Sequence, residues 1–252
     1  MKNQIILWSA SIILTFLIGY FKAVTSTYYP LTGTFGIEGK KVSYKLDKLS
    51  FDKILYRNII ISDVSGLSGK IVMLNQDNQT EINMIGIDKG LAGEIPALKP
   101  GKKLFYKIKL SYDKNTYDIP EKGFVSLTFW GKIPSAVKGI YLLLLYGGLL
   151  LSIRSGMELF NKNKFLKKFA FTTSTFFILN TILVSPLYNS YKLGAINKYV
   201  PSFADLFESA LIIITLVWIG GTVLLFFKKY ILITTISAGI ITVILFFLLP
   251  SV

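Results

Sequence analysis

The chain contains no cysteine and no histidine, and only 17% of its 252 residues are charged. Without cysteine, a disulfide framework, a thiol nucleophile and a thiolate-held iron–sulfur cluster are excluded. Without histidine, the usual haem ligand, the usual zinc ligand and the usual general base are missing as well. We therefore expect no metal site and no cofactor, and we favour a non-enzymatic function over an enzymatic one.

The shortage of charge accompanies a hydrophobic fraction of 52% and a mean hydropathy of +0.54. A soluble domain carries about a quarter charged residues, so the deficit indicates lipid-facing surface. Crossing the hydrocarbon of a bilayer takes roughly 20 mostly apolar residues. Runs of about this length predict five membrane spans, at residues 5–21, 136–153, 169–188, 209–227 and 230–249. The first run exceeds the roughly 7–15 residues of a signal-peptide core, which favours an uncleaved anchor.

Basic loops predict the orientation of these spans, because positively charged loops resist translocation. Residues 154–168 contain five basic residues against one acid, and Lys228 and Lys229 form the turn between the last two spans. Both segments are expected to face the cytoplasm. The N-terminus then lies inside, whereas residues 23–135, the loop 189–206 and the C-terminus lie outside, in a bacterial inner membrane.

Residues 30–134 show a different pattern, with short alternating runs separated by glycine, proline, asparagine or aspartate. In residues 104–112, Leu104, Tyr106, Ile108 and Leu110 fall on one face, as in a half-buried strand. This pattern predicts antiparallel strands at residues 33–38, 41–46, 53–62, 70–74, 81–85, 104–112 and 123–131. Seven strands in such a segment favour an immunoglobulin-like or fibronectin-like sandwich, with a small barrel as the alternative.

The expected fold class is thus a membrane α+β protein. It combines a transmembrane anchor at residues 1–22, an extracytoplasmic antiparallel β-sandwich at residues 23–135 and a four-helix transmembrane region at residues 136–252. Of the net charge of +14, residues 23–135 carry +5, from 16 basic and 11 acidic residues, and the remainder carries +9. Because the topology accounts for most of this charge, we expect no nucleic-acid partner. Membrane lipids and membrane proteins are the expected partners.

Ionisable residues lie only near the ends of the predicted spans, which disfavours a proton-coupled transporter. The polar residues within them include Asn180, Ser185 and several threonines, next to Pro186. Hydrogen bonding within and between helices is the simpler interpretation, and a substrate path is the alternative. Small residues at 147–148 and 220–221 are candidates for close helix contacts, within the chain or with a partner.

Two charged pairs are the candidate ligand or partner sites. Arg154 and Glu158 are spaced i, i+4, so that a helix places them on one face, and a solvated salt bridge is the simpler interpretation. Asp205 and Glu208 lie at the start of the fourth span, where the helix dipole favours negative charge. They are alternatively a carboxylate pair for metal binding or acid–base chemistry, helped by Lys192, Lys198 and Tyr199 in the same loop.

The segment Ile119-Pro120-Glu121, then residues 127–134, a span, and residues 151–158 with Arg154, Gly156 and Glu158 resemble an uncharacterised group of bacterial multi-pass membrane proteins. In that group an outer β domain similarly leads into a span that ends in a serine-x-arginine-x-glycine-x-glutamate segment. The resemblance implies an inner-membrane location and no particular activity.

These observations favour an accessory or assembly subunit of a membrane complex, which presents its β domain to partner proteins. A transporter or channel subunit with a path through spans three to five is the first alternative. A membrane enzyme acting on lipid-linked or envelope substrates through Asp205 and Glu208 is the second.

Overall fold

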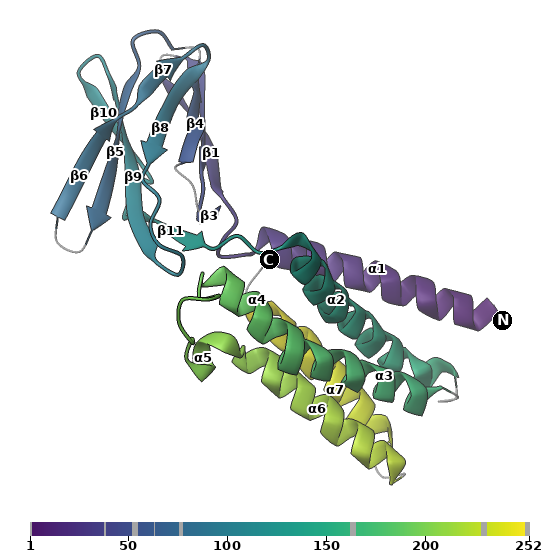
Figure 1. Cartoon of the computed structure of the whole chain (residues 1–252). Coiled ribbons are helices and arrows are strands. Elements are labelled where there is room, and N and C mark those ends of the chain that lie inside the picture. Colours follow the sequence, from purple (N-terminus) through teal and green to yellow (C-terminus); the bar gives the residue numbers. More distant parts are fainter. Residues whose placement is uncertain are drawn as a thin grey trace. The chain divides into compact units, whose positions relative to one another are not determined.

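The computed structural model describes residues 2–37, 39–51, 55–62, 64–75, 78–161, 165–227 and 231–249 (Figure 1). The chain divides into two compact units. The β unit comprises Thr27–Lys132 and Lys192–Gly194, and the helical unit comprises Met1–Ser26, Ile133–Tyr191 and Ala195–Val252. Sheets and helices therefore occupy separate units, as in the α+β class expected from the sequence.

The first sheet of the β unit has five strands in the order β1-β2-β4-β8-β7. They are β1 (Leu31–Ile37), β2 (Lys40–Leu46), β4 (Leu55–Ser62), β8 (Gly90–Ile95) and β7 (Ile85–Ile87). All neighbouring strands in this sheet are antiparallel. Gly39 has a φ of +77° in the β1–β2 turn, a backbone conformation that glycine adopts without a steric penalty.

The second sheet has the order β3-β11-β9-β5-β6, and β10 pairs with β9 beside this path. Its strands are β3 (Leu49–Phe51), β11 (Val125–Trp130), β9 (Lys103–Tyr112), β5 (Ser68–Asn75), β6 (Asn78–Asn83) and β10 (Asn115–Ile119). β9 is the central strand, because it pairs with β5 along one edge and with β11 and β10 along the other.

A single apolar core holds the two sheets together. Leu104, Tyr106, Ile108 and Leu110 of β9 are all buried, which confirms the alternation predicted for this segment. They belong to one cluster with buried residues of the first sheet, among them Val42. Burying a leucine- or isoleucine-sized side chain contributes about 1.5–3 kcal/mol, so the shared core is the main force between the sheets.

The sequence underestimated the number of strands and missed one feature of their pairing. The structure adds β3, β7, β8 and β10 to the seven predicted strands, and the predicted strand at 81–85 covers the end of β6 and the start of β7. β3 pairs with β11 in parallel, so the second sheet is not purely antiparallel. Strands of three to six residues are stabilised by their neighbours more than by local propensity, and their sequences carry a weak signal. The immunoglobulin-like topology stays a prediction.

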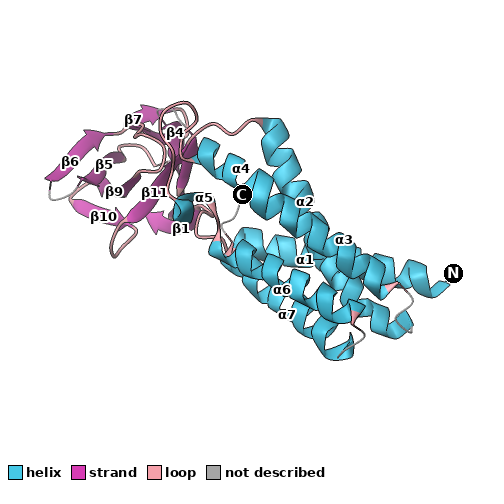
Figure 2. Cartoon of the chain, turned by 60° about the horizontal axis from the view of Figure 1, so that its bottom comes forward, coloured by secondary structure: helices cyan, strands magenta, loops and turns pink. Residues whose placement is uncertain are grey.

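The helical unit contains seven α-helices in the described residues (Figure 2). They are α1 (Lys2–Val24), α2 (Ser135–Met157), α3 (Leu166–Leu179), α4 (Ser185–Lys192), α5 (Phe203–Leu206), α6 (Ser209–Phe226) and α7 (Ile231–Leu248). A π-helical segment, Asn180–Val184, joins α3 to α4 in one continuous rod. α2 packs against α1, α3 and α7, and α6 packs against α3 and α7.

Four helices in the described part of the chain are long and apolar enough to cross a membrane, rather than the five that the sequence predicted. They are Asn3–Val24, Ser135–Asn161, Leu166–Lys192 and Ser209–Phe226. The fifth predicted span corresponds to α7. Within α7 the stretch Thr234–Leu248 is apolar, but it is shorter than the four candidate spans. The turn at Lys228 and Lys229, and Tyr230 after it, lie outside the described residues.

The two predicted glycine pairs behave differently. A Cβ at Gly147 would lie 2.7 Å from the Phe176 ring, and a Cβ at Gly148 would lie 2.9 Å from the Phe177 ring. These glycines therefore allow α3 to pack closely on α2. Gly220 and Gly221 have nothing within 4 Å of such a Cβ, so they form no close contact in the described structure.

Hydroxyl groups hydrogen-bond within and between the helices, as the simpler interpretation of the polar span residues predicted. Thr172, Thr173 and Thr175 each donate to the carbonyl oxygen four residues earlier. Between helices, the Thr181 and Thr215 hydroxyls lie 2.7 Å apart, within hydrogen-bond distance of each other. These bonds satisfy groups that hydrocarbon cannot solvate.

Candidate functional site

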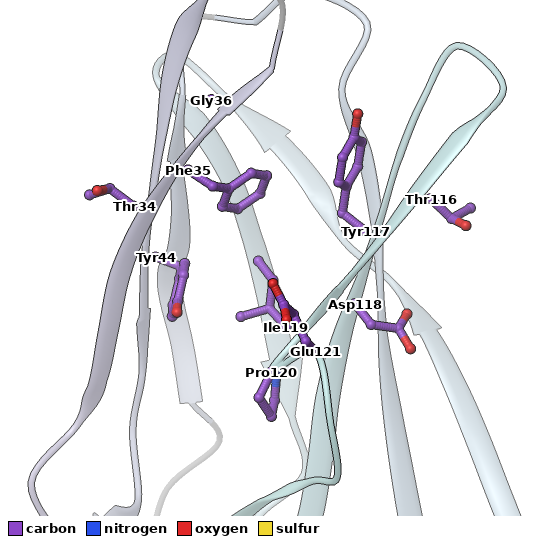
Figure 3. Close-up of a pocket in the computed structure, with 10 residues that line it drawn as sticks. All are labelled: Thr34, Phe35, Gly36, Tyr44, Thr116, Tyr117, Asp118, Ile119, Pro120 and Glu121. Atoms are coloured by element: carbon purple, nitrogen blue, oxygen red, sulfur yellow. The ribbon is translucent and has the colours of Figure 1, made fainter.

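A groove opens in the β unit between β1 and β10, the last strands on one side of the two sheets (Figure 3). Its volume is about 570 Å³, within the range of roughly 300–1,000 Å³ typical of ligand sites. The lining residues come from β1, β2, β10 and the segment after β10. They are Thr34, Phe35, Gly36, Tyr44, Thr116, Tyr117, Asp118, Ile119, Pro120 and Glu121.

Strand register places aromatic rings on the inner side of this groove. Tyr117 pairs with the buried Leu110 across the β9–β10 ladder, and Phe35 pairs with the buried Val42 across β1–β2. Directly paired residues share a sheet face, so both rings point towards the core and are half-buried over it. The ring centroids of Phe35 and Tyr117 are 5.8 Å apart, and Figure 3 shows them facing each other across the opening.

A glycine in β1 accommodates the third ring. The Tyr44 phenol packs over Gly33, where any Cβ would collide with it. The Tyr44 ring lies 6.4 Å from the Phe35 ring. Three aromatic side chains therefore form the apolar part of the groove, and they close one edge of the hydrophobic core.

Two carboxylates border the β10 side of the groove, and Figure 3 shows the Asp118 side chain turned away from the opening. Asp118, in β10, pairs with Lys107 of β9 at 2.6 Å, and both side chains are partly exposed. Glu121 is exposed just beyond the strand. Apolar rings beside carboxylates can bind a ligand that combines an apolar group with a cation or a hydrogen-bond donor.

The groove could not be predicted from the sequence, because the predicted strands do not include residues 115–119. Asp113, in the turn between β9 and β10, has a φ of +52°. The alternation of Tyr117 and Ile119 after that turn was the available signal for a hairpin. No local pattern could show that β1, some 80 residues earlier, borders the same opening.

The predicted acid pair, Asp205 and Glu208, is engaged by different partners. Asp205 is exposed and accepts a 2.7 Å hydrogen bond from Ser202 Oγ, at the start of the short helix α5. Glu208 precedes α6 without capping it through its side chain, and instead accepts a hydrogen bond from the Tyr141 hydroxyl at 3.1 Å. Glu208 lies at the N-terminus of α6 as expected, but its carboxylate has a tertiary partner in Tyr141 and makes no side-chain cap.

The loop residues expected to assist these acids belong to two different units. Lys192 belongs to the β unit, where its ammonium lies 4.3 Å from the centre of the Trp130 ring. Lys198 and Tyr199 are exposed residues of the helical unit. Within the described segments, no three acidic side chains come together as a metal site. The geometry thus gives no support to metal or acid–base chemistry at this loop.

The second predicted pair, Arg154 and Glu158, is completely buried, so its interpretation as a solvated salt bridge is wrong. The two side chains pair at 2.6 Å, and Arg154 Nη2 also donates to Gln4 Oε1 of α1. The guanidinium lies over the rings of Trp8 and Phe169, at 5.5 and 4.8 Å. The pair is therefore hydrogen-bonded to α1 through Gln4 and packs against α3 through the Phe169 ring.

Asn180 is fully buried at the start of the π-helical segment, and neither its amide nitrogen nor its amide oxygen has a hydrogen-bond partner in the structure. A buried unpaired amide is costly, and π-helical turns occur frequently at functional sites. Tyr188, farther along the same rod, stacks on Tyr141 with ring centroids 4.3 Å apart. Sequence reasoning singled out Asn180 but missed the tyrosine pair, whose members are 47 positions apart.

Comparisons with protein-family models, with curated proteins and with solved structures give no match to this chain. The class of the protein therefore follows from its own architecture. Four helices long and apolar enough to cross a bilayer indicate a membrane protein, and it carries a separate β unit of two sheets.

Proposed function

We propose that the protein is a non-enzymatic accessory or assembly subunit of a membrane complex, and that its β unit binds partner proteins. The groove between β1 and β10 carries this proposal. An unpaired strand edge is a template for pairing with another chain, and natural proteins usually cover or charge such edges. Here two edges border one opening lined by aromatic residues, and aromatic side chains are enriched in protein interfaces.

The proposal includes a multi-pass topology in a bacterial inner membrane, with the N-terminus inside and the β unit outside. Basic residues near the expected cytoplasmic ends of the spans support this orientation. The natural absence of cysteine allows a clean test with single-cysteine variants and a membrane-impermeant maleimide. In intact cells stripped of any outer membrane, Ser65→Cys should be labelled and Phe160→Cys should be labelled only after lysis. The reverse pattern would overturn the orientation.

The functional test is purification from the native membrane in mild detergent, followed by mass spectrometry. We expect a stoichiometric set of membrane proteins to copurify with the wild-type chain. A Glu121→Arg variant places a long cationic side chain at the rim of the groove and should lose them. The matched Thr80→Arg variant, on the exposed edge strand β6, should retain them. Isolation of the wild-type chain as a single species would overturn the proposal.

A transporter or channel subunit is the second candidate, and the unpaired amide of Asn180 favours it. A path through the helices needs polar groups that a substrate or water can reach. Of the three cavities described in this structure, one lies between α1 and α2 and two lie in the β unit, so none opens beside Asn180. Asn180→Cys tests the path: modification by a small water-soluble thiosulfonate would support it, and protection from the reagent would exclude it.

A further inference from the structure

We propose that the groove binds an extended polypeptide segment, which adds as a further strand along the outer edge of β10 and carries lysine or arginine between apolar residues. The inference rests on the proposed function, because it names the kind of partner segment that this site accepts. Three features of the groove support it: its strand edges, its aromatic floor and its acidic rim.

The strand edges favour a polypeptide over other ligands. Among the described strands, β10 pairs only with β9, and β1 pairs only with β2. Both β10 and β1 therefore have an outer edge that no other described strand covers. An extended segment can hydrogen-bond to such an edge through its main chain, whereas its side chains provide specificity. Five residues of β10 correspond to about 17 Å of strand, long enough to align a segment of similar length.

The floor of the groove favours apolar residues at alternate positions of that segment. Side chains of a strand alternate between the two faces of its sheet, so every second residue of an added strand points to the inner side. There it meets the half-buried rings of Phe35 and Tyr117, which lie directly over the core of the β unit. Apolar side chains at these positions would bury the exposed parts of both rings.

The rim favours a cation at intervening positions. Asp118 and Glu121 bring two carboxylates to the β10 side, although the β domain as a whole has more basic than acidic residues. Lys107 neutralises Asp118, and Glu121 is the more exposed of the two acids. Glu121 is therefore the acid that remains to pair with a lysine or arginine of the partner, on a domain with more basic than acidic residues.

Fluorescence binding to the full-length protein in mild detergent tests this inference. One fluorophore is attached to Thr116→Cys on β10, and a separate sample carries it on Thr80→Cys on β6, which is also an exposed edge strand. The probe is an equimolar pool of nine-residue peptides that alternate valine, isoleucine or phenylalanine with lysine. We expect a saturable response at position 116 and none at position 80.

Two altered peptide pools distinguish strand addition from non-specific hydrophobic binding. Methylation of alternate backbone nitrogens should abolish binding, because it removes the main-chain donors of the added strand. Glutamate in place of lysine should weaken binding, and a Glu121→Lys variant should weaken the lysine pool about five- to tenfold, the effect of a charge reversal at a partly solvated position. Equal responses at both label positions, or insensitivity to backbone methylation, would overturn the inference.

Other outcomes distinguish this inference from the broader proposal. A saturable response at position 116 to a neutral oligosaccharide, with none to the peptides, would show that the groove binds a glycan and would overturn the polypeptide as its ligand. No response to the lysine pool, while partner proteins still copurify with the wild-type chain, would overturn strand addition and leave the accessory function standing. Peptide binding at position 116 without any copurifying protein would contradict the accessory function instead.

Discussion

Arg154 Nη2 and Glu158 Oε1 lie 2.6 Å apart, and both side chains are completely buried within the helical unit. The Glu158 carboxylate also accepts hydrogen bonds from Asn161 Nδ2 and from the backbone nitrogen of Phe165. The pair thus connects the end of α2 to the turn that leads into α3. A charge removed from water needs such compensation, because desolvation costs several kcal/mol for each ion.

Removing one member of this pair should destabilise the helical unit more than removing both. Arg154→Met leaves a buried carboxylate and Glu158→Leu leaves a buried guanidinium, and each should lower the free energy of unfolding by about 3–5 kcal/mol. The double variant should recover much of this loss because it leaves neither charge unpaired. Thermal unfolding in a single detergent measures all three variants. A double variant as unstable as the sum of the singles would contradict this prediction.

The close approach of α2 and α3 should be sensitive to a single methyl group. In Gly148→Ala the new Cβ lies 2.9 Å from the buried Phe177 ring. Overpacking costs about 1–3 kcal/mol, against a gain in helix propensity of up to about 1 kcal/mol. We expect a net loss in the unfolding midpoint. Gly220→Ala, which meets nothing within 4 Å, is the matched control and should be neutral or stabilising. Equal effects of both substitutions would show that the packing is looser than described.

The hydrogen bond from Tyr141 to Glu208 should contribute to stability. Tyr141→Phe keeps the ring that stacks on Tyr188 but removes the donor to the carboxylate. Hydrogen bonds to charged groups contribute about 1.5–3 kcal/mol, so we expect a loss of that order in the free energy of unfolding. Asp205→Asn, which changes an exposed acid, should have an effect below about 0.5 kcal/mol. A larger effect at Asp205 than at Tyr141 would contradict the assignment of partners.

Tyr106 should make the β unit sensitive to alkaline pH. Burial in the core raises the pKa of its hydroxyl well above the ordinary value of 10.0, and that hydroxyl donates to the Asp47 carbonyl at 2.8 Å. Since the folded state holds this proton more tightly than the unfolded state, stability should fall as the pH rises above 10.0. The slope for this one group approaches 1.4 kcal/mol for each pH unit.

Comparison with Tyr106→Phe isolates this contribution. The variant should lose about 0.5–1.5 kcal/mol at neutral pH with the hydrogen bond to Asp47. Above pH 10 its stability should decline less steeply than that of the wild-type chain. Near-ultraviolet circular dichroism during denaturation at several pH values provides the measurement. Parallel pH profiles for the two proteins would show that Tyr106 does not titrate differently on folding.

The elements predicted well are those whose pattern is long and local. β9 was recognisable because ten residues alternate without interruption, and the first four apolar helices because their runs approach the thickness of a bilayer. β3 and β7 have three residues each, too few for any period to stand out. β3 is a strand because it pairs with β11, almost 80 residues later, and β7 is held in its short ladder with the adjacent β8.

For the candidate sites, the sequence identified which charged residues are close in the chain, but it did not predict their burial or their partners. The spacing of Arg154 and Glu158 correctly placed them on one helix face, but their burial depends on Trp8 and Phe169 from two other helices. Asp205 and Glu208 are three positions apart, yet an irregular joint between α5 and α6 gives them separate partners. A charged pair in sequence therefore does not specify its own exposure.

The sequence by itself determined the chemical class of this protein: no thiol or imidazole chemistry, long apolar helices, and a separate region of alternating strands. These properties depend on composition and on periods that a few neighbouring residues define. Only the tertiary structure decided that Arg154 and Glu158 are buried together and that Phe35 and Tyr117 face each other across a groove. Burial and proximity depend on which distant segments pack together, and that packing reflects the free energy of the whole core rather than any local pattern.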